Sequence, residues 1–505
     1  MAAANKPETV DVVVLGMGPG GESVAGELAA AGLSVVGVEA RLVGGECPYY
    51  GCIPSKMMIR GGNVVAEALR IPGLAGTVEV TPDFTTVAGR IRSEATDNWD
   101  DTVAAKRFTD KGGRLVRGTG RLTGPREVTV SMPDGGPLTF RARLAVVLNP
   151  GSNPVVPDVP GLAGTPFWTN REAVQAQTAP KSLIVWGGGP IAVELAQAFT
   201  RFGTKVTMVL RGSQLISKEE PESAELLAAV FRSEGIKILW NKEVTSVSHS
   251  RGRFRVHLEN SESEPGAGTD SGPDSASAAA SATTSASTST STAAAAAGPR
   301  LSAEQFLVAT GRAPALAELG LPKAGIKVKK KGAPTVDEHL QLADGLYLIG
   351  DAVGAGAFTH MSMHQGNIVT GHILARHSGA PERGVADNHA VPRVTFTDPE
   401  IGVVGMTEKQ ARDAGLSVRT GFTALGDSTR GWIHKSGNQG FIKVVEDADS
   451  GVLVGATSMG PMGGEVLSML ALAVHARIPV ATLQSMIYAY PTFHRAIPEA
   501  LRALK

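Results

Sequence analysis

A strand, a glycine-rich loop and a helix occur in succession twice in this chain of 505 residues, and this repeat constrains the fold more than any other feature. In the first copy, the apolar run 12–15 leads into a glycine-rich loop, a helical segment and a second apolar run that ends in an acid. Such glycines let the backbone approach a pyrophosphate at the start of the helix, and the terminal carboxylate can bind a ribose. The residues that we assign to this dinucleotide site are Gly16, Gly18, Gly21 and Glu39.

The second copy spans residues 183–210 and predicts a second dinucleotide site, with Gly187 and Gly189 in its loop. No acidic residue ends its second strand, because Leu210 stands there and Arg211 follows. An arginine at this point suits a ribose 2′-phosphate, so Arg211 favours NADPH over NADH. The alternative is that Arg211 is an ordinary surface residue.

The only two cysteines of the chain, Cys47 and Cys52, lie close together just after the first nucleotide pattern. The following Pro54-Ser55 favours a turn into a helix, and a thiol at a helix N-terminus has a lowered pKa. This arrangement is typical of a dithiol/disulfide redox couple. The alternatives are two inert core thiols or half of a zinc site. Zinc would require two further Cys or His ligands at matching spacing, and since none is visible, the sequence predicts no metal.

The segment from Gly44 to Lys56 resembles the flavoprotein disulfide reductases, the family of lipoamide dehydrogenase, glutathione reductase and mercuric reductase. The resemblance implies FAD in the first dinucleotide fold and a nicotinamide, NADPH or NADH, in the second. It also implies that Cys52 is the thiolate beside the flavin and that Cys47 exchanges with the substrate. Lys56 is then expected near the flavin, paired with Glu194. The further cofactor residues that it implies are Gly45, Gly350 and Asp351 for FAD and Gly311 for the nicotinamide.

The resemblance covers nearly the whole chain and implies an α/β fold with two Rossmann-like dinucleotide-binding domains and a C-terminal α+β interface domain. We expect FAD-binding segments at 1–159 and 336–386, an NAD(P)-binding domain at 160–335 and the interface domain at 387–505. Residues 260–299 are rich in Ser, Ala, Thr and Gly and cannot bury enough apolar surface to order themselves. We therefore predict a disordered insertion at the tip of a hairpin formed by strands 254–258 and 305–309.

The last motif of the family, His-Pro-Thr-x-x-Glu, is altered. Tyr490 occupies the position of the histidine that shuttles protons, and Arg495 occupies that of the glutamate. His494 is four residues after Tyr490 and would share a helix face with it, so it can replace the missing base, with Glu499 orienting it. The alternative is that His494 only packs or caps the helix. Two further departures from the family pattern are Glu46 in place of threonine and Asn149-Pro150-Gly151 in place of Ala-Thr-Gly.

Charge and hydropathy exclude several classes of function. The 48 basic and 48 acidic residues balance, which argues against binding to nucleic acid or to an anionic membrane. We find no secretory signal and no apolar run long enough to span a bilayer, so we expect a cytoplasmic protein.

These observations predict a homodimeric, FAD-dependent NAD(P)H oxidoreductase that passes electrons through the flavin to a Cys47–Cys52 disulfide and on to a small disulfide substrate. The altered C-terminal motif favours an alternative, an NAD(P)H:quinone reductase in which the cysteine pair is accessory. Mercuric reductase is a third possibility, but its usual extra cysteine pair is absent. A non-enzymatic flavoprotein that senses redox state or binds a partner is the remaining class.

Overall fold

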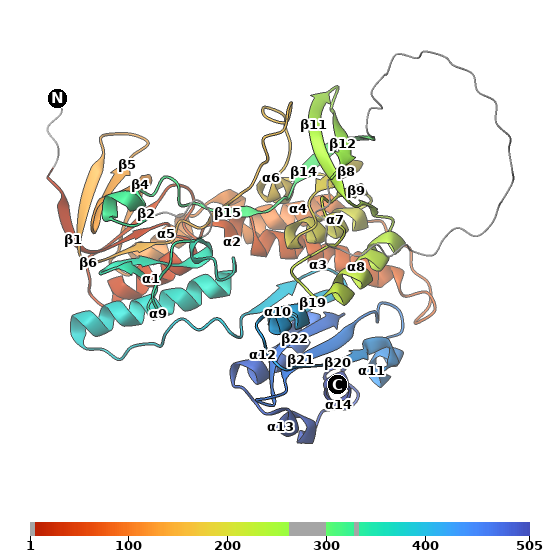
Figure 1. The fold of residues 1–505 in the computed structure, drawn as a ribbon. Coiled ribbons are helices and arrows are strands. Elements are labelled where there is room, and N and C mark those ends of the chain that lie inside the picture. Colours follow the sequence, from red (N-terminus) through yellow and green to blue (C-terminus); the bar gives the residue numbers. More distant parts are fainter. Residues whose placement is uncertain (1–5, 262–298, 328–332) are drawn as a thin grey trace, which may run out of the picture.

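The computed structural model describes residues 6–261, 299–327 and 333–505, which form three units, each built on its own sheet (Figure 1). The first unit has an eight-stranded sheet in which β1 (Glu8–Leu15) lies between two parallel neighbours, β2 (Val35–Glu39) and β6 (Leu138–Leu148). Residues 12–14 of β1 are completely buried, because a strand covered on both faces is apolar throughout. The other strands are β3 (Arg114–Arg117), β4 (Thr119–Gly124), β5 (Glu127–Ser131), β16 (Gln341–Ala343) and β17 (Leu346–Leu348).

Residues from far along the chain complete this first sheet. Strand β17 pairs in parallel with β6 and brings the segment that follows it, Gly350–Val353, to the edge where the first glycine-rich loop lies. The next helix, α9 (Thr359–Ser378), packs along α1 (Pro19–Ala30), and the two lie side by side against the sheet (Figure 1). The loop and the Gly350 segment therefore meet at the carboxyl ends of parallel strands, where α/β sheets bind ligands.

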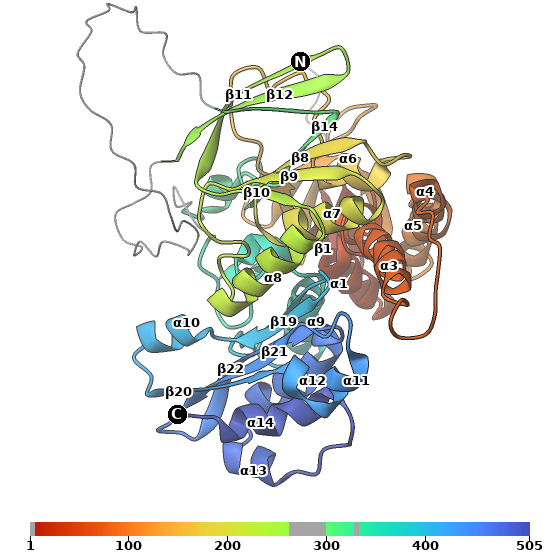
Figure 2. The same ribbon diagram turned by 90° about the vertical axis from the view of Figure 1, so that its right-hand side faces the viewer.

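The second unit repeats this plan on a smaller scale. Its parallel strands have the order β10 (Lys237–Leu239), β9 (Lys205–Val209), β8 (Ser182–Trp186) and β14 (Gln305–Val308). Helices α7 (Pro190–Arg201) and α8 (Pro221–Ser233) cover the side of this sheet that faces the C-terminal unit (Figure 2). A two-stranded link, β7 (Ser152–Pro154) with β15 (Arg312–Pro314), connects the first two units.

The predicted hairpin has a different second strand from the one we expected. Strand β12 (Arg253–Asn260) pairs with β11 (Lys242–Ser250) on one edge and with β13 (Arg300–Ala303) on the other. The segment 305–309 instead contributes β14 to the edge of the parallel sheet, where it pairs with β8, because its consecutive apolar residues are buried on both faces, as in other strands of parallel sheets. Of the predicted insertion at 260–299, residues 262–298 lie outside the described residues, and its described ends adjoin the paired strands β12 and β13, with Asn260 as the last residue of β12.

The third unit is an antiparallel sheet covered by helices. Its strands have the order β18 (Pro392–Thr395), β19 (Glu400–Gly405), β22 (Val452–Gly460), β21 (Phe441–Asp447) and β20 (Val418–Ala424). Its helices are α10 (Glu408–Asp413), α11 (Thr429–His434), α12 (Gly463–His475), α13 (Val480–Ser485) and α14 (Ile497–Arg502). The remaining α-helices, all before residue 180, are α2 (Glu46–Tyr49), α3 (Cys52–Leu69), α4 (Phe84–Arg90), α5 (Thr102–Thr109) and α6 (Asn170–Gln175).

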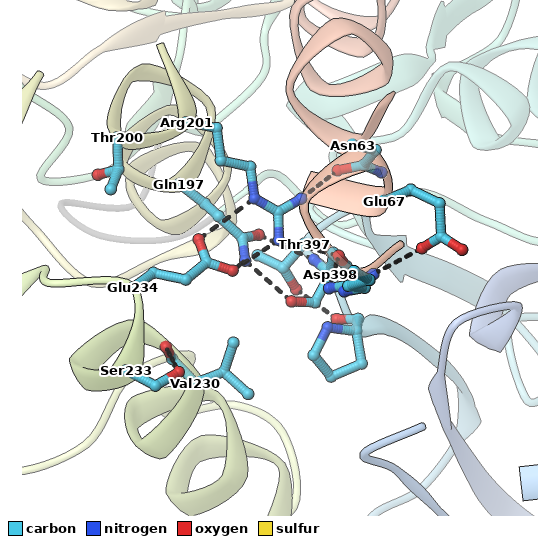
Figure 3. Close-up of polar contacts among 12 residues, drawn as sticks. Asn63, Glu67, Gln197, Thr200, Arg201, Val230, Ser233, Glu234, Thr397 and Asp398 are labelled. Carbon is cyan, nitrogen blue, oxygen red and sulfur yellow. Dashed lines mark hydrogen bonds and ion pairs between the residues drawn. The ribbon is translucent and has the colours of Figure 1, made fainter. Parts of the chain in front are cut away.

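A buried group of charges joins the three units (Figure 3). The guanidinium of Arg201, on α7, lies 2.6 Å from Glu234, which follows α8, and 2.9 Å from Asp398 of the third unit. Asp398 also forms an ion pair with Arg70, at the end of α3, at 2.6 Å. The side chain of Arg201 is only 4% exposed, so its charge depends on these carboxylates.

We expect Arg201→Met to lower the free energy of unfolding by about 3 kcal/mol, because it keeps the aliphatic stem but leaves Glu234 without its buried partner and removes one from Asp398. The measurement is urea unfolding of the purified protein, followed by circular dichroism through the first cooperative transition. Lys106→Met is the control, since its ion pair with Asp110 is exposed and is worth about 0.5 kcal/mol or less. Equal effects of the two variants would contradict the assigned role of the buried charges.

Candidate active site

A cavity of about 1290 Å³ runs between the first two units and reaches the third. Its walls include the first glycine-rich loop and Glu39, the start of α3, the start of α7 and the segment 357–362 at the start of α9. The volume lies above the roughly 300–1,000 Å³ of an ordinary small-molecule pocket. It therefore has room for a dinucleotide with a second nucleotide beside it.

In each of the two glycine-rich loops, a glycine lies in close contact with the backbone carbonyl at the end of a neighbouring strand. Gly16 has a φ of +92°, and a Cβ there would lie 2.1 Å from the carbonyl oxygen of Asn149, just after β6. Gly187 has a φ of +134°, and a Cβ there would lie 2.2 Å from the carbonyl oxygen of Ala309, just after β14. Only glycine fits either position. The unusual Asn149 thus occupies the structural position that Ala309 has in the second unit, and its side-chain amide also donates to the Gly16 carbonyl at 3.2 Å.

Glu39 ends β2 at the wall of the cavity. One carboxylate oxygen accepts from the Met17 amide and the other from the Arg41 amide, both at 2.8 Å. These bonds hold the carboxylate beside the loop, where a ribose diol could bind, while burial raises its pKa. Helix α1 begins at Pro19 and adds its N-terminal dipole, so this half of the cavity fits the adenosine diphosphate part of FAD.

Asp351 lies in the helical turn after β17 and lines the same cavity. Its carboxylate accepts from the hydroxyl of Ser152, which in turn accepts from Arg312 Nε at 2.8 Å. The amide of Gly350 donates to Gln365 Oε1 at 2.7 Å, which fixes the turn against α9. The predicted FAD residues Asp351 and Gly350 therefore lie by the first loop, and Gly45, with a φ of +67°, lines the cavity opposite Gly18.

The two cysteines lie at the junction of the short helix α2 and the long helix α3. Cys47 is inside α2, and Cys52 is the first residue of α3; both are free thiols that line the cavity. The Sγ of Cys52 lies 3.4 Å from the hydroxyl of Thr359, the first residue of α9. Two helix N-termini thus point at Cys52, a position that favours a thiolate.

The environments of the two thiols drive their pKa values apart. The hydrogen bond from Cys47, with help from Thr359 and Lys56, outweighs burial and lowers the pKa of Cys52 to about 6. The same hydrogen bond and burial raise the pKa of Cys47 above its ordinary value. One thiol of the reduced pair is therefore charged and the other protonated at neutral pH.

Lys56 lies one turn into α3 and pairs with Glu194 of α7 at 2.7 Å, as the sequence led us to expect. The second carboxylate oxygen of Glu194 accepts from the Phe396 amide at 2.8 Å, and the Lys56 ammonium lies 4.7 Å from the centre of the Phe396 ring. The side chain of Glu194 is only 6% exposed, so its carboxylate holds the Lys56 ammonium from a buried position at the wall of the cavity. This contact joins α3, α7 and the third unit at the cavity.

Glu46, where the family commonly has threonine, is the centre of an arginine cluster. Its carboxylate lies 2.5 Å from Arg171, 3.5 Å from Arg312 and 3.9 Å from Arg41, all of which line the cavity. The amide of Asn170 also donates to it, at 3.3 Å. A threonine is too short to make these contacts, so the substitution ties the cysteine segment to α6 and to β15. The sequence did not indicate Asn170, Arg171 and Arg312 as partners, because each lies more than a hundred residues away along the chain.

The structure does not support the helical argument that linked Tyr490 with His494. Tyr490 precedes a cis proline in a turn, and the helical segment begins only at Phe493, so the two side chains do not share a helix face. Glu499, our candidate for orienting His494, instead pairs with Arg495 at 3.1 Å and with Arg502 at 2.5 Å. Tyr490 is 69% exposed and donates to Thr429 at 3.4 Å across a second cavity of about 560 Å³.

The predicted nicotinamide residues lie at the edge of the second sheet. Gly189 precedes α7, Gly311 has a φ of +136°, and Arg211 is exposed in the bend after β9. Leu210, in the position usual for an acid, is buried in the core. Thus the strand ends with a buried apolar residue followed by an exposed arginine. Among the described helices, none has the length and apolar character to cross a lipid bilayer.

Two dinucleotide folds that share one cavity, with a cysteine pair between them, define a class of pyridine-nucleotide-dependent flavoproteins. Residues 10–366 match the model of the pyridine nucleotide-disulphide oxidoreductases, and residues 391–501 match the dimerisation domain of the same family. The chain belongs to this family and is therefore an oxidoreductase that uses FAD and NAD(P)H. The dimerisation domain fits a homodimer.

Individual relatives have different activities. The chain is 28% identical to a mercuric reductase of Acidithiobacillus ferrooxidans over 97% of this chain and 82% of the relative. It is 29% identical to a dihydrolipoyl dehydrogenase of Thermus scotoductus over 98% of both chains. The same fold occurs in RclA, an HOCl-induced flavoprotein disulfide reductase of Escherichia coli (Cu(II) complex; TM-score 0.78, 24% identity), over 98% of this chain and 99% of that one. It also occurs in LpdA of Mycobacterium tuberculosis (TM-score 0.79, 23% identity), with the same shares covered.

In a Cys47→Ser variant, where Cys52 is the only thiol and the serine hydroxyl can still donate a hydrogen bond to it, we expect alkylation by iodoacetamide to follow a midpoint below the ordinary thiol value of 9.0, because Thr359 and Lys56 continue to lower the pKa of Cys52. Because the thiolate is the reactive form, the rate should fall as the pH drops through this midpoint. Lys56→Met should move the midpoint upward, since a stabilising positive charge is lost. Arg60→Met, exposed on the same helix, is the control and should leave it unchanged. A midpoint near 9 in the parent variant would contradict this picture of the site.

Proposed function

We propose that this enzyme reduces a small oxidised acceptor with electrons from NADPH, through the Cys47–Cys52 pair. The observation that carries the proposal is the position of Cys52, at the start of α3, in the cavity that is lined by the first glycine-rich loop and by the start of α7. The family and the fold support the oxidoreductase chemistry, and the contacts of the cysteines support their part in it. When bound, FAD supplies the electron transfer between the nicotinamide and the cysteine pair.

The residues around the cavity have different roles, which follow from their charges. Cys52 holds the thiolate, which Lys56 and the start of α9 stabilise at the cavity wall. Cys47 keeps its proton and is the thiol that exchanges with the acceptor. Glu194 positions Lys56, while Glu39 and Asp351 would hold the cofactor through its hydroxyl groups. Oxidation of this thiol–thiolate pair to a disulfide passes two electrons and the one proton of Cys47 to the acceptor, whose second proton comes from the acid group that contacts it or from water.

The group that would exchange a proton with the acceptor differs from the histidine that is usual in the family. In a dimer, the segment around Tyr490 would lie at the partner's cysteines, and Tyr490 is exposed there with its hydroxyl held by Thr429. A phenol can donate a proton or a hydrogen bond but is a poor base at neutral pH. We assign Tyr490 the contact with the acceptor. His494, partly buried in the helical segment behind it, is a second candidate for the proton transfer.

The first experiment is an anaerobic titration of the purified enzyme with NADPH and then with NADH. A long-wavelength absorption band after two electrons indicates a thiolate in contact with the flavin and supports the disulfide pathway. Direct bleaching of the flavin after two electrons supports the second candidate function, an NAD(P)H:quinone reductase that bypasses the cysteines. The exposed Tyr490 in place of a histidine is the observation that favours this second candidate.

Cys52→Ser separates the two functions. We expect reduction of a small disulfide to fall by at least about 100-fold, because the nucleophilic thiolate is lost. The measurement compares steady-state turnover of a disulfide and of a quinone by the same preparation, with FAD content as the control for folding. Full quinone turnover together with loss of disulfide turnover would make quinone reduction independent of the thiol. Undiminished disulfide turnover in Cys52→Ser would show that the cysteine pair takes no part in the mechanism.

Arg211→Met tests the coenzyme preference. We expect the ratio of kcat/KM for NADPH to that for NADH to fall by about tenfold or more, since an arginine contact with a phosphate is a charge-assisted hydrogen bond. Stopped-flow reduction by each coenzyme measures the ratio directly. Lys205→Met, exposed at the opposite end of β9, is the matched control. An unchanged ratio in Arg211→Met would assign Arg211 to the ordinary surface.

A further inference from the structure

A second group of chemically reactive side chains lies in the first unit, away from the cysteines. His339 is in the turn before β16, His372 is on α9, and Glu382 is in the segment after α9. One nitrogen of each imidazole and one carboxylate oxygen lie within 4.8 Å of one another. Because His372 is thirteen residues along α9 from Thr359, the group lies about 20 Å along the helix from the thiol of Cys52.

The imidazole of His372 is buried and that of His339 is partly buried, and each has a buried ring nitrogen without a partner in the part of the chain that the structure describes. Among the described residues, the Nδ1 atoms of His339 and His372 are buried and accept or donate no hydrogen bond. His372 is only 8% exposed, and its ring lies 4.2 Å, centre to centre, from that of His339. A buried imidazole nitrogen without a hydrogen-bond partner is costly. A metal ion bound by such a nitrogen would supply the missing partner.

The Glu382 carboxylate lies close enough to the imidazoles to bind a metal ion together with them. Its Oε2 lies 4.0 Å from His339 Nε2, and Glu338 reaches the same nitrogen at 3.7 Å. The other charged groups nearby are engaged elsewhere: Asp337 accepts from the His339 and Gln341 amides, and Arg376 pairs with Asp344 at 2.8 Å. Both Glu338 and Glu382 are largely exposed at the side chain, so they can adjust to a bound ion.

We propose that His339, His372 and Glu382 form a site for a divalent transition metal of the zinc type. Two imidazoles and a carboxylate are the ligand set that Zn²⁺ binds at about 2.0–2.2 Å, with a fourth position for a water or another carboxylate. Tetrahedral ligands at that distance are about 3.4 Å apart, so the present group needs to contract by little more than 1 Å. The bound ion would join the segment after α9 to the helix and to the turn before β16, and so to the unit that holds Asp351.

Zinc binding by calorimetry is the direct test, on the FAD-loaded, oxidised enzyme after removal of metal with a chelator. We expect one Zn²⁺ per chain, and the same stoichiometry in a Cys47→Ser/Cys52→Ser background, which removes the thiols as ligands. His339→Gln and Glu382→Gln should each weaken binding by at least about tenfold. His377→Gln, exposed on the same helix, is the matched control and should bind as the parent does. The substitutions are made at His339 and Glu382, which are partly exposed, because a change at the buried His372 could disturb folding.

Electron paramagnetic resonance of added Cu²⁺ provides a readout that does not depend on turnover. We expect hyperfine coupling to two imidazole nitrogens in the parent and in His377→Gln, and to one in His339→Gln. Absence of stoichiometric zinc binding, or retained affinity in either ligand variant, would overturn the site. Because the measurement uses oxidised enzyme and no substrate, its outcome is independent of which acceptor the enzyme reduces.

Discussion

The packing of α3 against α7 is the contact on which the arrangement of the whole chain depends. Along α7, Glu194, Gln197 and Arg201 are spaced three and four residues apart, so they form one buried polar face. None of these groups is satisfied within its own helix: Lys56 of α3 pairs with Glu194, and the segment at Asp398 binds Gln197 and Arg201. Buried polar groups require such partners, so the three units are held in one relative arrangement.

That arrangement sets the chemistry of the cysteines. The start of α3 fixes Cys52 in the first unit, while the ammonium that helps to stabilise its thiolate is positioned by Glu194 of the second unit. On the opposite side, Glu46 binds Arg171 and Arg312 of the second unit and so anchors the segment that carries Cys47. The redox pair is therefore supported from both units that are expected to bind its cofactors. Its two thiols differ in pKa because one is at a helix N-terminus and hydrogen-bonded as a thiolate, and the other donates that bond.

Local patterns allowed much of the site to be predicted. The two glycine-rich loops and Glu39 at the end of β2 were expected, because each rests on a short motif with one structural solution. The pairing of Lys56 with Glu194, which are 138 residues apart, was expected from the family resemblance. The hairpin partner at 305–309 was wrong, since an apolar run of four residues does not reveal whether it joins a parallel or an antiparallel sheet. The shared helix face of Tyr490 and His494 was also wrong, because the chain turns at Pro491 before the helical segment begins.

The sequence by itself determined that this chain binds two dinucleotides and carries a cysteine pair beside the first, because strand, loop and helix periods and the cysteine spacing are local properties. Only the tertiary structure decided what surrounds them. The partners of Glu46, the buried charges around Arg201 and the group of His339, His372 and Glu382 each bring together segments that are far apart in the chain. No local pattern encodes such contacts, since they arise from the packing of separate units rather than from neighbouring residues.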